Sequence, residues 1–323
     1  MSAGVLRATY ELAPAGMAEA FAIEESTGMA DGPAFVRGRV VEEGGGRAVI
    51  EFPAANWGAN VPLLVSSLVA GEATEDGAFT RCRLVGLDLP EGFLPGPALG
   101  GAPDVVVGVI VKPSLGLSPA EVAERVAAAT GAGARFVKDD ELLGDPEWCP
   151  LEERVRAVAA VLPPGVTYCA NVTGPVATLV ERARRVVELG ATGLLVNAVA
   201  QGLDSVLALR RAGLGVPLVV HRAGSGPWTR NPAFGVSGAV LTSLFRWCGA
   251  DVVMAGAFGG KLFETPEQVR ANLAAAHLPL LQRAPLRVAQ QLVVLDEAGA
   301  GPGSGRHPLG HLGRGQAERR LDD

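Results

Sequence analysis

Cysteine is scarce in this sequence, and no two cysteines have the close spacing of a metal-binding or redox motif. The four cysteines are scattered along the chain, at Cys82, Cys149, Cys169 and Cys248. This pattern argues against a disulfide framework and against a structural zinc site. It is typical of a protein of the reducing cytoplasm.

Long apolar runs and an excess of basic residues are also missing. No apolar stretch approaches the roughly 20 residues that a membrane helix needs, and the amino terminus lacks the charged and apolar regions of a signal peptide. The formal net charge is -6, which offers no basic footprint for nucleic acid. We therefore expect a cytoplasmic protein that binds neither nucleic acid nor membrane. Its 323 residues, 48% of them hydrophobic, are enough for a substantial core in one large domain or two.

The chain divides into three parts by pattern. Residues 1–100 predict a small α+β domain, with strands at "VLRATYEL", "RAVIEF" and "TRCRLVGLDL" and a Gly/Pro-rich linker at its end. Residues 101–280 alternate strands and helices. Residues 281–323 are rich in Gly, Pro and Arg and predict a disordered tail.

The middle part repeats one strand–helix unit six times. The first unit is "DVVVGVIVK" followed by "SPAEVAERVAAATGAG", in which a serine cap and a proline begin the helix and a glycine ends it. The other strands are "ARFVKDD", "VTYCANV", "ATGLLVNAV", "VPLVVHR" and "DVVMAGA", each followed by a helical pattern. After "VPLVVHR" that pattern is "FGVSGAVLTSLFRWCG", which begins at Phe234. Six such units predict a parallel sheet buried on both faces, either doubly wound or in a (β/α)8 barrel.

Polar residues at the strand ends favour the barrel, because barrel enzymes place their chemistry at the carboxyl ends of strands. Six polar residues fall at such ends: Lys112, Lys138, Asp140, Asn171, Asn197 and His221. Eight units do not fit in the remaining length. The sequence thus predicts a TIM barrel that is incomplete at its carboxyl-terminal end.

The segment "RFVKDDELL" gathers a lysine and three acids at the end of the second barrel strand. Side chains alternate along a strand, so Lys138 and Asp140 face one way, Asp139 faces the other, and Glu141 follows where the strand ends. Two carboxylates suit a hard ion such as Mg²⁺, provided that the lysine is neutral or is carbamylated by CO2 and so becomes a third oxygen ligand. The alternative is a solvated charge run with a Lys–Asp ion pair.

Short motifs then resemble one family. "VIVKPSLGLSP" and "FVKDDE", followed by "HRA" at 221–223 and "GKLFE" at 260–264 and preceded by "IEESTG", are similar in order and spacing to the large chain of ribulose bisphosphate carboxylase and its RuBisCO-like relatives. The resemblance covers about residues 5–280. It implies that the first part is the family's α+β domain, of ferredoxin-like type, and that the second is its catalytic barrel.

The resemblance also implies roles for individual residues. Lys138 is the carbamylated ligand of a Mg²⁺ ion that Asp140 and Glu141 also hold, and Lys112 is the lysine that handles the substrate proton. The remaining implied contacts are with substrate: His221, Arg222 on a phosphate, Lys261 on a mobile loop, and Glu24 reaching the site of a neighbouring subunit in a homodimer. From their places at strand ends, we also expect Asn171 and Asn197 in the substrate pocket.

Departures from the family pattern bear on the reaction. Ser114 stands where true carboxylases keep a second lysine, and Met254 stands where the family has a histidine. We expect a Mg²⁺-dependent enzyme that enolises, isomerises or decarboxylates a phosphorylated ketose or keto acid without fixing CO2, as in methionine salvage or sugar-acid breakdown. A catalytically impaired binding protein for a phosphorylated ligand and a genuine carboxylase remain the alternatives, and the sequence does not name the substrate.

Overall fold

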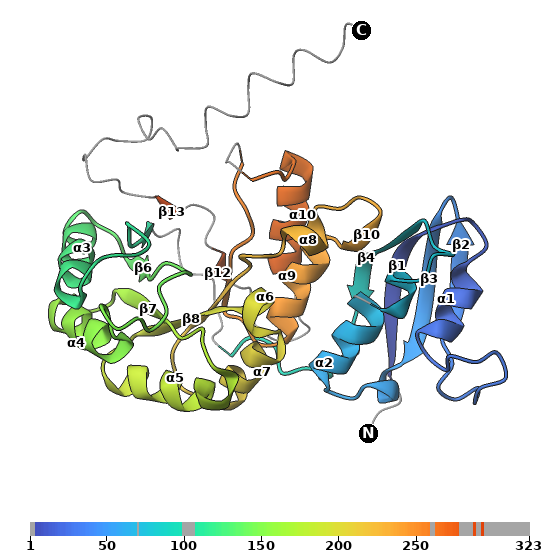
Figure 1. Cartoon of the computed structure of the whole chain (residues 1–323), viewed down its shortest axis with the longest axis horizontal. Coiled ribbons are helices and arrows are strands. Elements are labelled where there is room, and N and C mark those ends of the chain that lie inside the picture. The colour runs from blue at the N-terminus through green and yellow to red at the C-terminus, as the bar shows by residue number, and fades with distance from the viewer. Residues whose placement is uncertain are drawn as a thin grey trace, which may run out of the picture.

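The computed structural model describes residues 4–69, 71–98, 107–258, 262–277, 287–288 and 292–293. Two sheets organise these residues (Figure 1). The first has the strand order β10-β4-β1-β3-β2 and the second has the order β12-β11-β9-β8-β7-β6-β5-β13. The parallel sheet with its helices and the separate mixed sheet confirm the predicted fold class, a barrel that is incomplete and an amino-terminal α+β unit.

The first sheet follows from strands with one buried face. Side chains of β1 (Val5–Ala13) and β3 (Arg47–Pro53) alternate between buried and more exposed positions, so one face of each strand packs into a core. Helix α1 (Ala18–Glu24) covers that face, and its Phe21 ring lies 4.4 Å from the ring of Tyr10. The antiparallel neighbours are β2 (Arg39–Gly44) and β4 (Arg81–Asp88). Short helical turns lie between β3 and β4, at Ala54–Asn56, α2 (Val61–Leu64), Val65–Val69 and Glu72–Thr74.

One strand of this sheet comes from the part of the chain that is predicted to form the barrel. The sequence predicts a continuous helix from Phe234, but Phe234–Val236 form β10, which pairs in parallel with β4, and helix α9 (Gly238–Trp247) begins only after the cap residue Ser237. Arg83 of β4 fastens this segment, since it donates to the carbonyl oxygens of Thr229 at 2.8 Å and of Phe234 at 3.0 Å. The first sheet is therefore completed by residues that follow the fifth barrel strand.

The second sheet contains the six predicted strand–helix units, and the strand pairings within it are parallel throughout the described residues. Its strands are β5 (Gly108–Ile110), β6 (Phe136–Lys138), β7 (Thr167–Asn171), β8 (Gly193–Asn197), β9 (Leu218–His221), β11 (Val252–Val253), β12 (Arg287–Val288) and β13 (Leu292–Val293). The helices between them are α3 (Pro119–Gly131), α4 (Leu151–Val161), α5 (Leu179–Glu188) after a short turn at Val176–Thr178, α6 (Ala198–Gln201), α7 (Asp204–Arg211), α8 (Gly226–Thr229), α9 and α10 (Pro266–His277).

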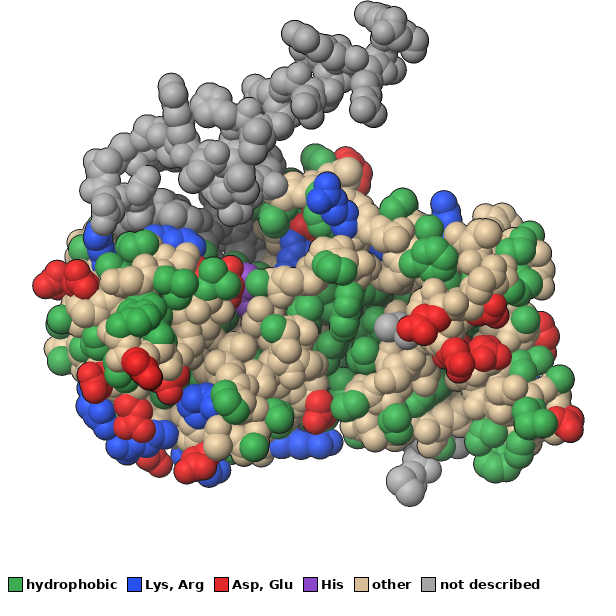
Figure 2. All heavy atoms as spheres, viewed as in Figure 1, with side chains coloured by type: hydrophobic (Ala, Val, Ile, Leu, Met, Phe, Trp, Pro, Cys, Tyr) green, Lys and Arg blue, Asp and Glu red, His purple; other side chains and the backbone are tan. Residues whose placement is uncertain are grey.

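Local sequence explains where these helices begin and which faces they bury. Helix α3 starts with the predicted serine cap: the Ser118 hydroxyl accepts from the Glu121 N–H while the Glu121 carboxylate accepts from the Ser118 N–H. The outer surfaces of α4 and α5 carry interleaved acidic and basic side chains (Figure 2), joined by ion pairs from Glu152 to Arg156 and Arg185. No helix within the described ranges has the length and apolar character needed to cross a bilayer.

The short strands β12 and β13 stand at the two ends of the parallel sheet, and among the described residues no pairing joins one to the other. The predicted domain boundary near residue 100 lies outside the described residues. So does the predicted tail at 281–323, apart from β12 and β13.

An apolar layer fills the inside of the parallel sheet. Buried side chains from neighbouring strands form it: Cys169, Leu195, Val219 and Val252, with Phe136 packed against them. Because side chains alternate along a strand, the residues two positions further on face the same interior at the carboxyl ends of the strands. Residues that each lie two positions beyond the apolar layer on neighbouring strands are therefore brought together at one end of the sheet.

Candidate active site

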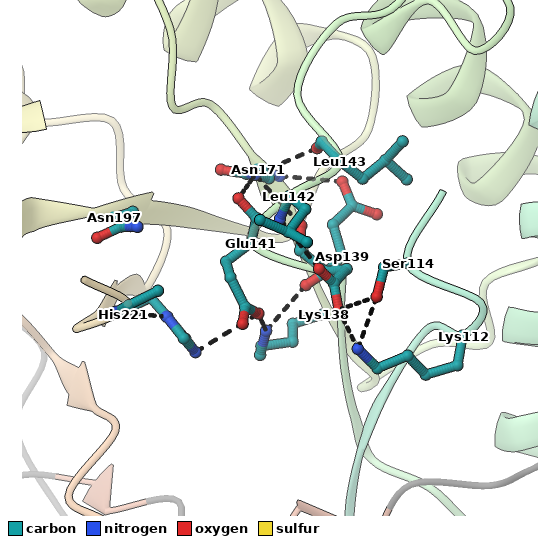
Figure 3. A network of polar contacts seen from close by, with 12 residues as sticks. Lys112, Ser114, Lys138, Asp139, Glu141, Leu142, Leu143, Asn171, Asn197 and His221 are labelled. Atoms are coloured by element: carbon teal, nitrogen blue, oxygen red, sulfur yellow. Dashed lines mark hydrogen bonds and ion pairs between the residues drawn. The ribbon is translucent and has the colours of Figure 1, made fainter. Parts of the chain in front are cut away.

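A polar layer lies directly above the apolar one. It consists of the residues two positions beyond the apolar layer, Lys138 on β6, Asn171 on β7, Asn197 on β8 and His221 on β9. Figure 3 shows these side chains gathered at one end of the strands, with Lys112 reaching them from the segment after β5. The charged run is not a solvated one, since Lys138, Asp139 and Asp140 are at most 1% exposed. The alternative prediction, a solvated charge run at the strand end, is thus wrong.

Glu141 joins Lys138 to His221. Its Oε2 atom lies 3.3 Å from Nζ of Lys138 and 3.5 Å from Nε2 of His221. Burial acts to raise the pKa of Glu141, but His221 and Lys138 lower it, and the net shift is downward. Glu141 is therefore an anion between two nitrogen groups that come from different strands.

Lys112 and Asp140 form the second contact of the cluster. The Lys112 ammonium donates to Oδ2 of Asp140 and, at 2.8 Å, to the hydroxyl of Ser114, which itself donates to Asp140 at 3.0 Å. Burial acts to raise the pKa of Asp140, but hydrogen bonds from Lys112 and from the Leu142 N–H outweigh it, and the pKa is lowered. Ser114 thus belongs to this contact, which the sequence did not indicate.

His221 is neutral at neutral pH, and its proton is placed by a backbone contact. The Ala223 N–H donates to Nδ1 at 3.0 Å, so Nδ1 is unprotonated and the ring carries its hydrogen on Nε2, facing Glu141. Burial, together with the positive charge of Lys138, lowers the pKa of His221 to about 4. The imidazole is therefore a hydrogen-bond donor at the centre of the cluster.

Asp139 points away from the cluster, as the alternation along the strand predicts. Its carboxylate accepts from Nε of Arg154 at 3.1 Å, from the Tyr168 hydroxyl at 2.7 Å and from the Asn171 N–H at 3.0 Å. Arg154 and Tyr168 are wholly buried. Asp139 is thus an internal anchor that fixes the strand end from behind.

The Asn171 side chain, which we expect in the substrate pocket, has internal partners. Its amide nitrogen donates to the carbonyl oxygens of Asp140, Glu141 and Leu143 at 3.1–3.2 Å, and its oxygen accepts from the Thr173 N–H. These bonds use the hydrogen-bonding capacity of the amide. Asn171 therefore holds the segment that carries both site carboxylates.

Two other expected substrate residues also have internal partners. Asn197 caps α6, since its side-chain oxygen accepts from the Val199 and Ala200 N–H groups. Arg222 binds Glu264 with both terminal nitrogens, a partner that the sequence did not suggest for it.

The remaining predicted residues do not join the cluster in one chain. Glu24 is exposed at the end of α1, which lies at the opposite end of the molecule from β6 (Figure 1). Lys261 lies outside the described residues.

Comparison with known proteins identifies the family. The family model described as "Ribulose bisphosphate carboxylase large chain, catalytic domain" matches residues 97–284. The chain belongs to this family. Within it, the similarity is to RuBisCO-like proteins, as the motifs implied.

Three RuBisCO-like or related proteins illustrate the extent of the similarity. A ribulose bisphosphate carboxylase-like protein of Allochromatium vinosum is 36% identical over 257 residues, which are 72% of this chain and 55% of that protein. The 2,3-diketo-5-methylthiopentyl-1-phosphate enolase of Geobacillus thermodenitrificans is 32% identical over 86% of this chain and 75% of its own. The crystal structure of a RuBisCO-like protein from Burkholderia fungorum aligns with a TM-score of 0.77 at 28% identity, over 88% of this chain and 80% of the other. The chain spans between about half and two thirds of the length of several of the curated relatives that it matches.

The donors of the RuBisCO-like site fit a hard cation on one condition. Within the part of the chain that the structure describes, no three His, Cys, Asp or Glu side chains are grouped so as to hold a metal ion. Asp140 and Glu141 offer two carboxylates, and Lys138 beside Glu141 offers a third oxygen ligand only as a carbamate. With that modification the set matches the oxygen ligands that Mg²⁺ prefers.

One signal in the sequence could have revealed the internal anchor. Arg154 occupies the apolar stripe of α4, whose buried positions are Leu151, Arg154, Val155 and Val158. An arginine at such a position needs a buried anion, and the only acids near the matching strand end are those of the "KDDE" segment. No comparable signal pointed to Glu264.

Proposed function

We propose that this protein enolises a phosphorylated ketose or keto acid in a Mg²⁺-dependent reaction and does not fix CO2. One observation carries the proposal: Lys112 contacts Asp140 in the same buried cluster in which Glu141 joins Lys138 to His221. An amine, two carboxylates and a neutral imidazole are the groups that enolisation needs. The name of the Geobacillus relative, an enolase of a diketo phosphate, supports the same reaction class.

Asp140, Glu141 and carbamylated Lys138 are the residues that would hold the ion. When bound, Mg²⁺ would polarise the keto oxygen of the substrate and acidify the neighbouring C–H bond. The near-complete burial of Lys138 and Asp140 keeps bulk water away from this point, which strengthens every charge interaction there.

Lys112 is the amine placed to accept the carbon-bound proton. It approaches from the segment after β5 and is held by Asp140 and Ser114. An ammonium has no lone pair, so Lys112 has to release Asp140 and lose one proton to the solvent that reaches its half-buried side chain before it acts as a base. Ser114 keeps the amine in place meanwhile.

His221 is the donor placed to stabilise the oxygen on which negative charge develops. Its Nε2–H faces Glu141 in this structure, and the Ala223 N–H keeps the ring in that orientation. With its hydrogen on Nε2, the neutral imidazole can donate a hydrogen bond to that oxygen.

Two substitutions support the absence of CO2 fixation. Ser114 and Met254 replace basic residues that the carboxylases keep, so this site has fewer cations for a carboxylated intermediate.

The position of Glu24 supports a homodimer. Glu24 lies on α1 at the far end of the molecule from β6 and could reach only the cluster of a second copy.

Deuterium exchange tests the proposal. The protein is incubated in D2O with Mg²⁺, bicarbonate and either 2,3-diketo-5-methylthiopentyl 1-phosphate or ribulose 1,5-bisphosphate, and loss of the carbon-bound hydrogen is followed by NMR. We expect exchange by the wild type and a loss of at least about 100-fold in Lys112→Met and Lys138→Ala. The surface variant Glu152→Gln serves as the matched control and should exchange at the wild-type rate.

Other outcomes would select the alternatives. Tight binding of either compound without exchange would point to a ligand-binding protein. Incorporation of labelled bicarbonate into ribulose 1,5-bisphosphate would reveal a carboxylase.

A further inference from the structure

Arg222 is held by an internal carboxylate. It follows His221 at the end of β9, the position where the family resemblance implies a phosphate contact. Its Nη1 atom donates to Oε1 of Glu264 at 2.7 Å, and its Nη2 atom contacts Oε2 of the same side chain. The two side chains are only 12% and 3% exposed. This two-point geometry is the one with which arginine binds phosphate, and here Glu264 takes it.

Glu264 is fixed from its other side as well. The Asn272 amide donates to Oε1 of Glu264 at 2.7 Å and to the Ala255 carbonyl at 3.0 Å. Asn272 is 1% exposed. The carboxylate therefore has a buried amide on one side and a guanidinium on the other, and its position is set by α10 as well as by β9.

The backbone after β11 closes on the same pair. Gly256 has a φ of +107°, and a Cβ atom there would lie 2.8 Å from Oε2 of Glu264 and 3.1 Å from Nη2 of Arg222. Any side chain at this position would force the pair apart. Three segments of the barrel thus converge on one ion pair, which is a built part of the fold.

The charge of Glu264 decides what can approach Arg222. A phosphate dianion would have to displace the carboxylate and leave it buried without its cation, or else lie beside it against its repulsion. An uncharged hydroxyl or thioether group meets neither obstacle.

We propose that Glu264 is a specificity-determining residue that keeps phosphate away from the Arg222 end of the site. The inference rests on the proposed function in one respect, that the substrate carries a phosphate elsewhere. It assigns an uncharged terminus to the part of the substrate next to His221 and Arg222.

Binding ratios test this inference without turnover. Dissociation constants of ribulose 1,5-bisphosphate, ribulose 1-phosphate and ribulose 5-phosphate are measured by calorimetry for the wild type, Glu264→Gln and the double variant Arg222→Gln/Glu264→Gln. We expect the wild type to bind the bisphosphate no more than about three-fold more tightly than the better monophosphate. Glu264→Gln should raise that preference by about ten-fold or more, and the double variant should lose the gain.

The opposite pattern overturns the inference. A wild-type preference for the bisphosphate of about ten-fold or more would do so, as would an unchanged ratio in a Glu264→Gln protein with a native circular dichroism spectrum. If Glu264→Gln does not fold, the single variant Arg222→Gln decides. We expect it to keep the wild-type ratio of bisphosphate to monophosphate affinity. If Arg222 bound phosphate in the wild type, its removal would instead lower that ratio by about ten-fold. Failure of both the wild type and Glu264→Gln to bind any of the three compounds would also contradict it. Because no step depends on exchange at carbon, the inference can hold where the deuterium test fails.

Discussion

The Asp139 carboxylate and the Arg154 guanidinium form a wholly buried ion pair, with Nε of Arg154 3.1 Å from Oδ2 of Asp139. This pair lies on the face of β6 opposite to Lys138 and behind the candidate site. The charges of the "KDDE" segment therefore divide into two sets. Lys138, Asp140 and Glu141 form the cluster, and Asp139 fixes the strand end that presents them.

Removing one member of the buried pair should destabilise the fold strongly. Asp139→Asn leaves the Arg154 charge without its anion, and we expect a loss of about 3–5 kcal/mol in the free energy of unfolding, measured in urea. Tyr168→Phe removes one neutral donor to Asp139 and should cost about 1–2 kcal/mol. Glu152→Gln breaks only surface ion pairs and should cost less than about 1 kcal/mol. Equal losses in the three variants would contradict this assignment.

Asn171 and Asn197 should separate metal affinity from stability. Asn171→Ala releases the carbonyl groups of the segment that carries Asp140 and Glu141, and we expect Mn²⁺ affinity, measured by electron paramagnetic resonance with bicarbonate present, to fall by about 10–100-fold. Asn197→Ala removes a helix cap, which should cost about 1 kcal/mol and leave Mn²⁺ affinity as it is. Unchanged affinity in Asn171→Ala would remove its positioning role.

The proposed carbamate can be seen directly, because lysine occurs in this chain only at Lys112, Lys138 and Lys261. With ¹³C-labelled bicarbonate and Mg²⁺, we expect one carbamate carbon resonance in the wild type. It should vanish in Lys138→Arg and remain in Lys261→Arg, since an arginine cannot form the carbamate. A resonance that survives in Lys138→Arg would place the modification elsewhere.

Stability should depend on pH through Glu25. Burial, together with the nearby carboxylates of Glu24 and Glu72, raises the pKa of Glu25 from 4.5 to about 7, although the Ala73 N–H opposes this. The pKa of Glu25 is higher in the folded protein than in the unfolded chain, so protonated Glu25 favours the folded state. This contribution to stability is fully present below about pH 4.5 and is lost as the pH rises through about 7.

Glu25→Gln should abolish that loss. We expect the difference in the free energy of unfolding between Glu25→Gln and the wild type, measured in urea, to be about 2 kcal/mol more in favour of the variant at pH 8 than at pH 5. Glu25 is the residue that caps the end of α1, and the exposed Glu19 in the first turn of α1 provides the control: Glu19→Gln should differ from the wild type by the same amount at both pH values. Parallel pH profiles for the wild type and Glu25→Gln would rule out the buried carboxyl as the cause.

Much of the fold could be predicted because its signals are local. The Ser118 cap, the apolar periodicity of the helices and the β-branched strands all act within a few residues, and the six strand–helix units follow from them. Strand β10 could not be predicted this way. Its residues, Phe234–Val236, form a strand only because β4, far away in the sequence, offers them an edge.

The site divides in the same manner. Spacing along one strand, together with the family motifs, placed Lys138, Asp140 and Glu141 together. Pairs such as Arg222 and Glu264, 42 positions apart, depend on how two loops meet in space. No periodicity in the sequence indicates such a contact. The family motif therefore predicts Arg222 as a phosphate ligand, although its nitrogens bind Glu264 within the chain.

A fragment that ended at residue 98 would leave β4 with unsatisfied N–H and C=O groups along one border, since residues 234–236 are the ones that cover it. Unpaired edge strands of this kind form hydrogen bonds with extended segments of other chains, which leads to aggregation. During synthesis, the amino-terminal sheet emerges from the ribosome long before its protecting strand does. We therefore expect the early translation product to need a chaperone until β10 has been made.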